Sequence, residues 1–594
     1  MGKQHNRTMK LTAVGVLAIA WAVSAGATQV LRPRCLEPIG VRDVAELSTE
    51  LPGSSVTVGM VELSQTFSHN ESEYAFVPNF EHQSLDDIER GGFYCYDRPG
   101  RPLCYSTHAG LIAGVLFGDD DDANCQQLGR FHYRGIVPAA AAVVYEANWF
   151  IYNVALVPRP QPISADVLSI SWGTDANDVV TMWWQRGIDA LAQRDGCVII
   201  AACGNGSDRT NAISKPSWGH NIISVGTASG LGQFPDNLRY IGPPAEGRTS
   251  CGPTDDGRAK PDIIAPGLSL GPAARGTGEY FCAEQPGQFS SFAAPQVAGV
   301  AAMLIDTARL NNIAGGDDPL VIRALLLNGA DKLVGWHKGL CSTCDDHSAV
   351  LDYRQGAGLV DALDSYVQLI AGACSPGEAG NIGWDLAELV TGDLNDNTDT
   401  DVDGAGDGTV AEAVYYMPRP LQAGNLVKAT LVWQRHYHDD RLYTPLPLNH
   451  LVLQLWAADE RGQLLELLDY SAGEYDNLQH IYYKNQENRR VALRITARQT
   501  EGAPPAETYA LAFYTGMTNW SGDRLAADFD ADGIVDIDDL LQLLDIWELQ
   551  RYNEPDELTE TYMPEDLDLD GRVDLTDFDL LTAWWQVKSP WHRP

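Results

Sequence analysis

Two different patterns of hydrophobic and polar residues follow each other along this chain of 594 residues. From Ser54 to about Gly372, continuous apolar runs of strand length alternate with longer helical patterns. Strands that are apolar on both faces and separated by helices are typical of a parallel sheet covered on both sides. The pattern therefore predicts an α/β domain over residues 51–372, built on a doubly wound parallel sheet. Its clearest predicted strands lie within 54–67, 165–173, 197–205 and 220–228.

A second pattern begins near Asn381, where short runs alternate between apolar and polar residues at turn-like spacing. Alternation of this kind is typical of strands with one buried face, and it predicts an antiparallel β-sandwich over 381–517. An acidic, low-complexity segment at 393–408 interrupts the sandwich. We expect a solvated surface loop there, with calcium binding as the alternative.

An internal duplication marks the last part of the chain, residues 519–594. Residues 528–547 and 566–585 align without gaps. Each repeat has the pattern D-x-D-x-D-G, an acid at loop position twelve and then an apolar helix pattern, which is typical of a loop that binds calcium through oxygen ligands. A merely acidic turn would not repeat all of these offsets, so we expect two calcium ions. The ligands expected in the first loop are Asp528, Asp530, Asp532, the Ile534 carbonyl, Asp536 and Asp539, and in the second Asp566, Asp568, Asp570, the Arg572 carbonyl, Asp574 and Asp577.

The first 27 residues have the features of a secretory signal peptide. A basic start is followed by the apolar run 11–23 and by the small residues Ala25-Gly26-Ala27. No later run reaches the roughly 18 apolar residues that a membrane span needs, so we expect export without a span in the mature chain. Residues 28–50 form a short lead-in segment. The formal net charge of −39 argues against nucleic acid or an anionic membrane as a partner.

Export leads to a compartment that permits disulfides, and the chain has 11 cysteines. Cys95 with Cys104, and Cys251 with Cys282, are candidate pairs, but the connectivity does not follow from the sequence. The residues His337, Cys341, Cys344 and His347 have the identities of a zinc site. In an exported protein, disulfides or a solvated loop are the favoured interpretation.

Two stretches carry the chemistry. Ser291 lies in FSSFAAPQVAGVAAML (289–304), and GPTDDGRAKPDIIAPG (252–267) precedes it. A small-residue turn that leads into a helix presents a hydroxyl at the helix N-terminus, where backbone N–H groups can receive an oxyanion. Together the two stretches resemble the subtilisin-like serine peptidases, or subtilases. The resemblance implies a subtilisin-like fold over 51–372 and hydrolysis of polypeptide substrates through an acyl-enzyme on Ser291, without an organic cofactor.

The remaining residues follow from the same resemblance. His108, in STHAGLIAGVLFG (106–118), takes the position of the catalytic base, Asn205 that of the oxyanion-binding asparagine, and Glu62 that of the orienting acid. Ser171, Trp172 and Gly173 match the strand that pairs with substrate backbone.

The chain departs from the family pattern at three of these positions. Glu62 stands where most members have Asp, Ala109 follows the histidine in place of Gly, and Phe289-Ser290 replaces Gly-Thr before the nucleophile. Phe289 is expected to remove glycine's backbone freedom at this turn. These departures support an alternative reading, in which the subtilase fold is inactive and serves as a surface or scaffold-bound binding module.

The last two parts of the chain also have counterparts. The sandwich resembles, in texture and position, the accessory β-domains that follow many secreted subtilase domains. The two loops, each followed by a single helix, resemble dockerin domains, which implies a small all-α calcium-binding domain and a cohesin-like partner on a scaffold or cell surface. The apolar helix faces, with Leu540, Leu541, Leu544 and Trp547 in the first and Leu580, Leu581 and Trp584 in the second, are expected to pack together or to meet a partner. A calcium-stabilised cap is the alternative.

Overall fold

The fold was analysed in a computed structural model of the whole chain. It describes residues 31–516 with gaps, and beyond them only 535, 537–545, 578, 581 and 582. The gaps are 48–50, 65–73, 87–92, 98–99, 101–103, 127, 157–162, 207–211, 234–236, 245–248, 268–269, 283–288, 334, 340–346, 391–410, 441 and 499. The expected signal peptide, the acidic segment 393–408 and most of the tail therefore lie outside the described residues.

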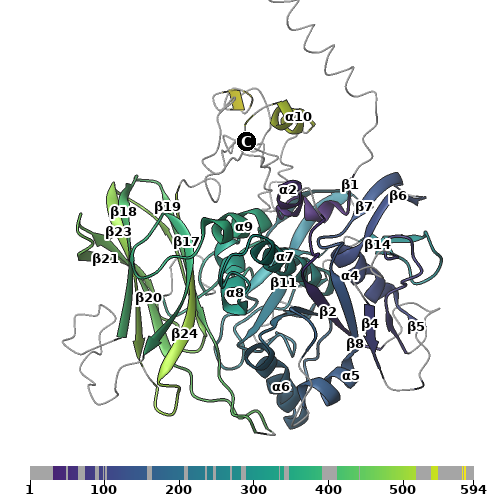
Figure 1. Cartoon of the computed structure of the whole chain (residues 1–594), viewed down its shortest axis with the longest axis horizontal. Coiled ribbons are helices and arrows are strands. Elements are labelled where there is room, and N and C mark those ends of the chain that lie inside the picture. The colour runs from purple at the N-terminus through teal and green to yellow at the C-terminus, as the bar shows by residue number, and fades with distance from the viewer. Residues whose placement is uncertain are drawn as a thin grey trace, which may run out of the picture.

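A parallel sheet forms the centre of the larger part of the molecule (Figure 1). Its strands run in the spatial order β4 (Phe93–Tyr96), β8 (Ala141–Glu146), β2 (Thr57–Glu62), β9 (Val167–Ile170), β10 (Val198–Ala202), β11 (Ile222–Gln233) and β13 (Ile263–Pro266). The antiparallel strand β12 (Asn237–Gly242) pairs with the end of β11. The α/β architecture with a parallel sheet, predicted from the apolar runs, is confirmed.

Helices cover both faces of this sheet. On one face α4 (Thr107–Phe117), α7 (Ser290–Leu310), α8 (Pro319–Gly329) and α9 (Ala362–Ala371) enclose the largest hydrophobic core. On the other face α5 (Ala147–Phe150), the π-helical turn Ile151–Ala155 and α6 (Val179–Asp195) enclose a second core. Both faces of the central strands are therefore excluded from water, which explains why these strands are apolar throughout.

The strand order reverses at β2. The chain passes from β2 to β8 on one side and then returns to β9 on the other side of β2. In open parallel sheets, ligands bind beyond the carboxyl ends of the strands at such a reversal. The topology thus points to the end of β2, where Glu62 is the last residue.

The lead-in segment belongs to the same body. Its strand β1 (Leu31–Arg32) pairs with β7 (Gly129–Arg134), which in turn pairs with β6 (Asp119–Cys125). A 3-10 turn at Arg34–Leu36 and the helix α2 (Val41–Glu46) follow, and the side chains of Leu36 and Ile39 are fully buried in the largest core. Smaller strand pairs are β3 (Ala75–Val77) with β5 (Cys104–Tyr105) and β14 (Leu270–Pro272) with β15 (Tyr280–Cys282).

Residues 377–516 form two further sheets, drawn in green in Figure 1. One has the order β16 (Gly377–Glu378), β18 (Ala411–Leu421), β23 (Arg489–Arg498), β20 (His450–Ala458) and β21 (Leu464–Ser471), and the other β17 (Ile382–Val390), β24 (Ala506–Gly516), β19 (Leu426–Trp433) and β22 (Leu478–Lys484). All pairs are antiparallel except the short contact between β16 and β18. Buried residues from both sheets share one core, among them Tyr415, Leu453, Leu431 and Leu511.

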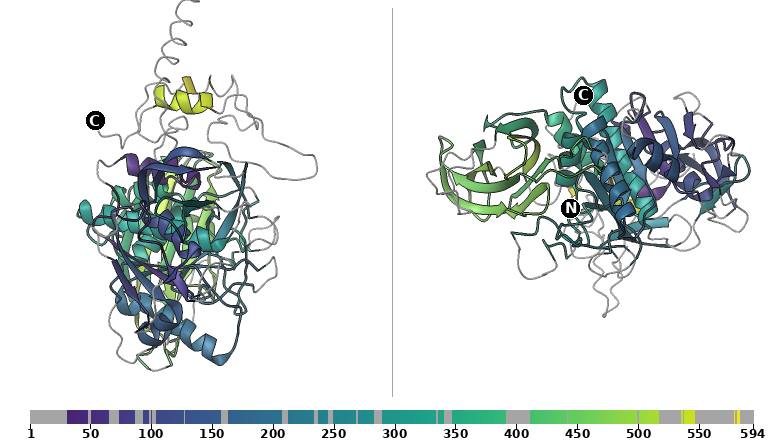
Figure 2. Two further views of the ribbon diagram at one scale, coloured as in Figure 1. Left: turned by 90° about the vertical axis from the view of Figure 1, so that its right-hand side faces the viewer. Right: turned by 90° about the horizontal axis from the view of Figure 1, so that it is seen from below.

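The second sheet also packs against the helices of the parallel-sheet part. Val432, Leu478 and Ala510 belong to the same hydrophobic core as α7, α8 and α9. Viewed from below, the green sheets lie directly against these helices (Figure 2). The hydrophobic core therefore continues from the parallel-sheet part into the antiparallel part.

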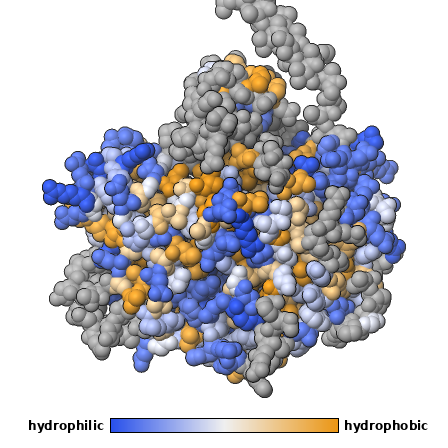
Figure 3. Space-filling model, in the orientation of Figure 1, coloured by the Kyte–Doolittle hydropathy of each residue, from blue (hydrophilic) through white to orange (hydrophobic). Residues whose placement is uncertain are grey.

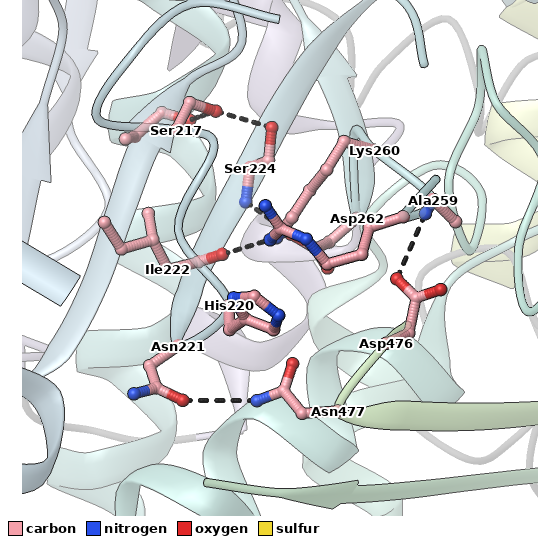
Figure 4. A network of polar contacts seen from close by, with 12 residues as sticks. Ser217, His220, Asn221, Ile222, Ser224, Ala259, Lys260, Asp262, Asp476 and Asn477 are labelled. Carbon is pink, nitrogen blue, oxygen red and sulfur yellow. Dashed lines mark hydrogen bonds and ion pairs between the residues drawn. The ribbon is translucent and has the colours of Figure 1, made fainter. Parts of the chain in front are cut away.

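Polar contacts close the rest of this junction (Figure 4). The carboxylate of Asp476, in the antiparallel part, accepts a hydrogen bond from the Ala259 N–H at 3.0 Å. The Asn477 side chain donates to Asn221 Oδ1 at 3.2 Å. Asn221 also exchanges two hydrogen bonds with the backbone of Arg435, at 2.9 and 2.8 Å.

One described helix, α7, is long and apolar enough to cross a membrane, but 89% of that stretch is buried inside the protein. The visible face of the molecule carries polar residues over most of its area, with apolar residues scattered between them (Figure 3). In the tail, α10 (Ile537–Asp545) is described. Leu541 and Leu544 are 45% and 47% exposed on this helix, whereas Leu543 is fully buried.

Of the two suggested disulfide pairs, that of Cys95 with Cys104 is not formed in this structure, because Cys95 carries a free thiol. The side chain of Cys282 lies outside the described part.

Candidate active site

The end of β2 carries the first pair of candidate residues. Glu62 Oε2 lies 2.9 Å from His108 Nδ1, and the side chains are only 3% and 7% exposed. A carboxylate at this distance accepts the Nδ1 proton and leaves Nε2 free to act as a base. Glu62 thus reaches the histidine even though it is one methylene longer than aspartate.

The helix α4 holds His108 at its second residue. Ser106 caps the helix by accepting a hydrogen bond from the Ala109 N–H at 3.4 Å, and the methyl group of Ala109 is buried in the largest hydrophobic core. Close packing against β14 restricts the next turns, because a Cβ at Gly110 would lie 2.6 Å from the Pro272 carbonyl oxygen. Replacement of the family's glycine by Ala109 is therefore compatible with the helix, whereas Gly110 has no room for a side chain.

The oxyanion-binding candidate lies beyond the end of β10. Gly204 precedes it with a φ of 108°, a conformation that favours glycine, and Asn205 is exposed. Asn205 Oδ1 accepts hydrogen bonds from the backbone N–H of Ser290 at 2.8 Å and from its hydroxyl at 3.0 Å. The Ser290 hydroxyl in turn accepts one from the Gly204 N–H at 3.1 Å.

These contacts orient the amide of Asn205. A backbone N–H can only donate, so the amide oxygen must face Ser290. The two hydrogens of Nδ2 are therefore the donors that this amide can offer to another acceptor. A donor fixed in this way is suited to stabilise a developing oxyanion.

Ser291 is the second residue of α7 and is partly exposed. The next residue, Phe292, lies with its ring 5.6 Å from the His108 ring, so the first turn of α7 lies beside His108. The expected loss of backbone freedom at Phe289 does not matter here. Phe289 has φ −114° and ψ 125°, extended values that any residue adopts.

The predicted substrate-binding strand follows β9. Ser171 is buried and Gly173 is exposed, while the Trp172 ring packs 5.7 Å from Trp184. A Cβ at Gly173 would lie 2.8 Å from Ser214 Cβ, so the strand needs glycine for its close approach to that segment.

Sequence reasoning missed three residues around the site. Ser290 anchors Asn205, Ser214 lies between the two glycines 173 and 204, and Glu146 lies beside Glu62 in the sheet register. Glu146 is buried and caps α5 through the Trp149 N–H at 2.8 Å. No sequence motif around Ser214 indicates that it lies near the site. The acidic residue at the end of the 141–146 strand could have indicated Glu146.

The predicted calcium ligands and the zinc-like residues lie only partly within the described part of the chain. Of the twelve predicted calcium ligands only Asp539 is described, and its side chain is fully buried in α10. Of the zinc-like set, the backbone N–H of His337 donates to the Asp352 carboxylate at 3.0 Å and His347 pairs with Asp469 at 3.3 Å. The two cysteines lie outside the described residues.

A further group of carboxylates, Asp331, Asp361 and Asp364, has oxygen atoms within 4.8 Å of one another. Burial and the two neighbouring carboxylates raise the pKa of Asp331 well above its usual value. Lys428 already pairs with Asp364 at 3.0 Å. The ammonium group of Lys428 thus compensates part of the negative charge in this cluster.

The parallel-sheet part of the chain is similar to a known protein family. Residues 97–358 match the Subtilase family. The chain thus contains a subtilase domain, as the motifs around Ser291 predicted.

The curated relatives are distant. The chain is 26% identical to pyrolysin from Pyrococcus furiosus over 47% of this chain and 19% of that protein, and 24% identical to the serine protease AprX from Bacillus subtilis over 49% and 64%. It spans less than two thirds of the length of either. A solved structure, the prenylagaramide maturation protease PagA, aligns with 18% identity over 55% of this chain and 98% of that chain, with a TM-score of 0.36.

Proposed function

We propose that this protein is a serine endopeptidase that hydrolyses peptide bonds through an acyl-enzyme on Ser291. The observation that carries the proposal is the buried pair of Glu62 and His108 at 2.9 Å, on the same edge of the sheet as the anchored amide of Asn205. The subtilase match over 97–358 supports it.

In the proposed mechanism, Ser291 Oγ attacks the scissile carbonyl while His108 Nε2 takes its proton. Glu62 stabilises the imidazolium through the Nδ1–H bond, and the Asn205 amide donates to the oxyanion. His108 then gives the proton to the leaving amine, and water releases the acyl group by the reverse sequence of proton transfers.

The alternative is an inactive subtilase fold that serves as a binding module. A fluorophosphonate probe separates the two, because it reacts only with an activated serine. We expect stoichiometric labelling of the wild type and no labelling of Ser291→Ala. A folded wild type that stays unlabelled would favour the binding module.

We further propose the organisation that the sequence predicts: an exported chain with signal peptide 1–27, a peptidase domain 51–372, a β-sandwich accessory domain 381–517 and a dockerin-like domain 519–594. The all-oxygen ligand sets of the two tail loops match the preference of calcium. A cohesin-like scaffold protein would be the partner of this tail.

Calcium titration of the full chain tests the tail. We expect a calcium-dependent rise in the melting temperature that Asp528→Ala with Asp566→Ala abolishes. An equal response of this double variant would place calcium binding elsewhere, and no response of the wild type would exclude these loops as calcium sites.

A further inference from the structure

Phe289 is unusual for its position. It is the N-cap of α7, where residues with a side-chain acceptor are preferred, and its side chain makes no capping hydrogen bond. The residue is also 43% exposed, although it lies two residues before Ser291. Neither helix capping nor burial in the core explains an aromatic residue here.

The ring has a defined place beside the catalytic groups. It packs edge-on against Phe292, with 6.1 Å between the ring centroids and an interplanar angle of 83°. Phe292 is 2% exposed and lies 5.6 Å from the His108 ring. Phe289 is thus the exposed end of a row of three rings that begins at the catalytic base.

A bound substrate comes within reach of this ring. The scissile carbon must lie about 3 Å from the nucleophile and from the oxyanion donor. The Cα of Phe289 is at most about 7.6 Å from that of Ser291, since two residues separate them by no more than two Cα steps. A long side chain next to the scissile bond can therefore contact the exposed ring.

We propose that Phe289 is a specificity-determining residue that contacts a large apolar or aromatic side chain flanking the scissile bond. This inference rests on the proposed peptidase function. Covering an exposed ring removes apolar surface from water, which favours binding. Contact between two aromatic rings adds to this free energy beyond the contribution of the buried area. Polar side chains at the same substrate position would gain no such contact.

The test uses the full-length protein and a peptide library that varies the residues on both sides of the cleaved bond. Phe289→Ala is compared with Phe289→Gly, which restores the residue common in the family. Leu465→Ala serves as the control, because Leu465 is 63% exposed on β21 of the antiparallel part. Active sites are counted first by fluorophosphonate labelling.

We expect both Phe289 variants to label fully but to lose about tenfold in kcat/KM for peptides with large apolar flanking residues, mainly through KM. Peptides with polar flanking residues and the Leu465 control should be unchanged. A wild-type cleavage profile in both Phe289 variants would overturn this inference alone. Absence of labelling in the wild type would instead overturn the proposed peptidase function.

Discussion

At the scale of single residues, the carboxylate of Glu62 sets the orientation of the His108 imidazole. Its Oε2 accepts the Nδ1 proton at 2.9 Å from a site that is nearly closed to water. Glu62→Gln would place an amide donor where that acceptor is needed and favour the wrong tautomer. We expect kcat to fall by roughly 10³–10⁴-fold with little change in KM.

Glu62→Asp is the matched variant. It keeps the charge but withdraws it by about one C–C bond, 1.5 Å. We expect a smaller loss, on the order of 100-fold, because misplacement of this size costs that much. Equal activity of Glu62→Asp and the wild type would show that the backbone of β2 adjusts, and full activity of Glu62→Gln would remove Glu62 from the catalytic set.

Ser290 gives a second prediction at this scale. Its hydroxyl supplies one of the two hydrogen bonds that hold Asn205 Oδ1. Ser290→Ala leaves the backbone donor and loosens the amide, so we expect kcat to fall roughly 3–10-fold, the equivalent of one hydrogen bond. Ser290→Thr should retain activity, and steady-state kinetics on one peptide substrate would measure both. If Ser290→Ala changes KM and not kcat, the hydroxyl does not act through Asn205.

The sequence indicates these groups as candidates but does not indicate what supports them. Ser291 and His108 stand in motifs whose offsets can be read directly. Ser290, by contrast, lies in the same motif but acquires its role only when α7 comes to lie against the end of β10. The backbone at Phe289 does not require glycine, because its φ of −114° and ψ of 125° are extended values that any residue adopts.

At the scale of elements, the segment 473–477 buries the carboxylate of Asp476 against the parallel-sheet part. Burial raises the pKa of Asp476 to about 7, although Arg258 and Lys260 lie near enough to oppose the shift. The carboxylate accepts from the Ala259 N–H, as Figure 4 shows. Ionised Asp476 thus destabilises the folded state relative to the unfolded chain.

The sign of the pH dependence follows. Since the folded pKa lies above the unfolded value of 3.8, the folded state binds the proton more tightly, and stability falls as pH rises from about 4 to about 7. Asp476→Asn keeps an acceptor for Ala259 and cannot ionise. We therefore expect the variant to gain stability relative to the wild type across this window, on the order of 4 kcal/mol by pH 8.

Chemical denaturation at pH 5 and pH 8 measures this difference. If the difference in unfolding free energy between variant and wild type is the same at both pH values, the ionisation of Asp476 does not destabilise the contact between the two parts. No feature of the sequence around Asp476 predicted this contact, because the charge and its partner are separated by more than two hundred positions.

At the scale of the whole molecule, the helix α8 joins the two parts. Its apolar residues are buried on every side, including Leu320, Val321, Ile322 and Leu326. A helix that is hydrophobic all round is not stable at a surface. The sequence pattern predicts a boundary between two domains near residue 372, because the periodicity of apolar residues changes there. Such a change marks a change of element type, but it carries no information on which faces pack together.

Removal of the antiparallel part should therefore disrupt the subtilase domain. A chain ending at residue 374 would expose α8 and leave Asp364 buried without Lys428, its partner at 3.0 Å. Loss of one partner from a buried pair alone costs roughly 3–5 kcal/mol, a large fraction of a typical domain's stability. We expect this fragment to aggregate or to unfold without a cooperative transition, and to lose fluorophosphonate labelling.

A chain ending at residue 518 is the control, since it keeps both sheets and lacks only the tail. It should remain monomeric, unfold cooperatively and label as the full chain does. Size-exclusion chromatography, thermal unfolding and labelling would be measured on both fragments in parallel. A soluble, labelled fragment ending at 374 would show that the antiparallel part is dispensable, and its role would then have to lie in binding rather than in completing the peptidase core.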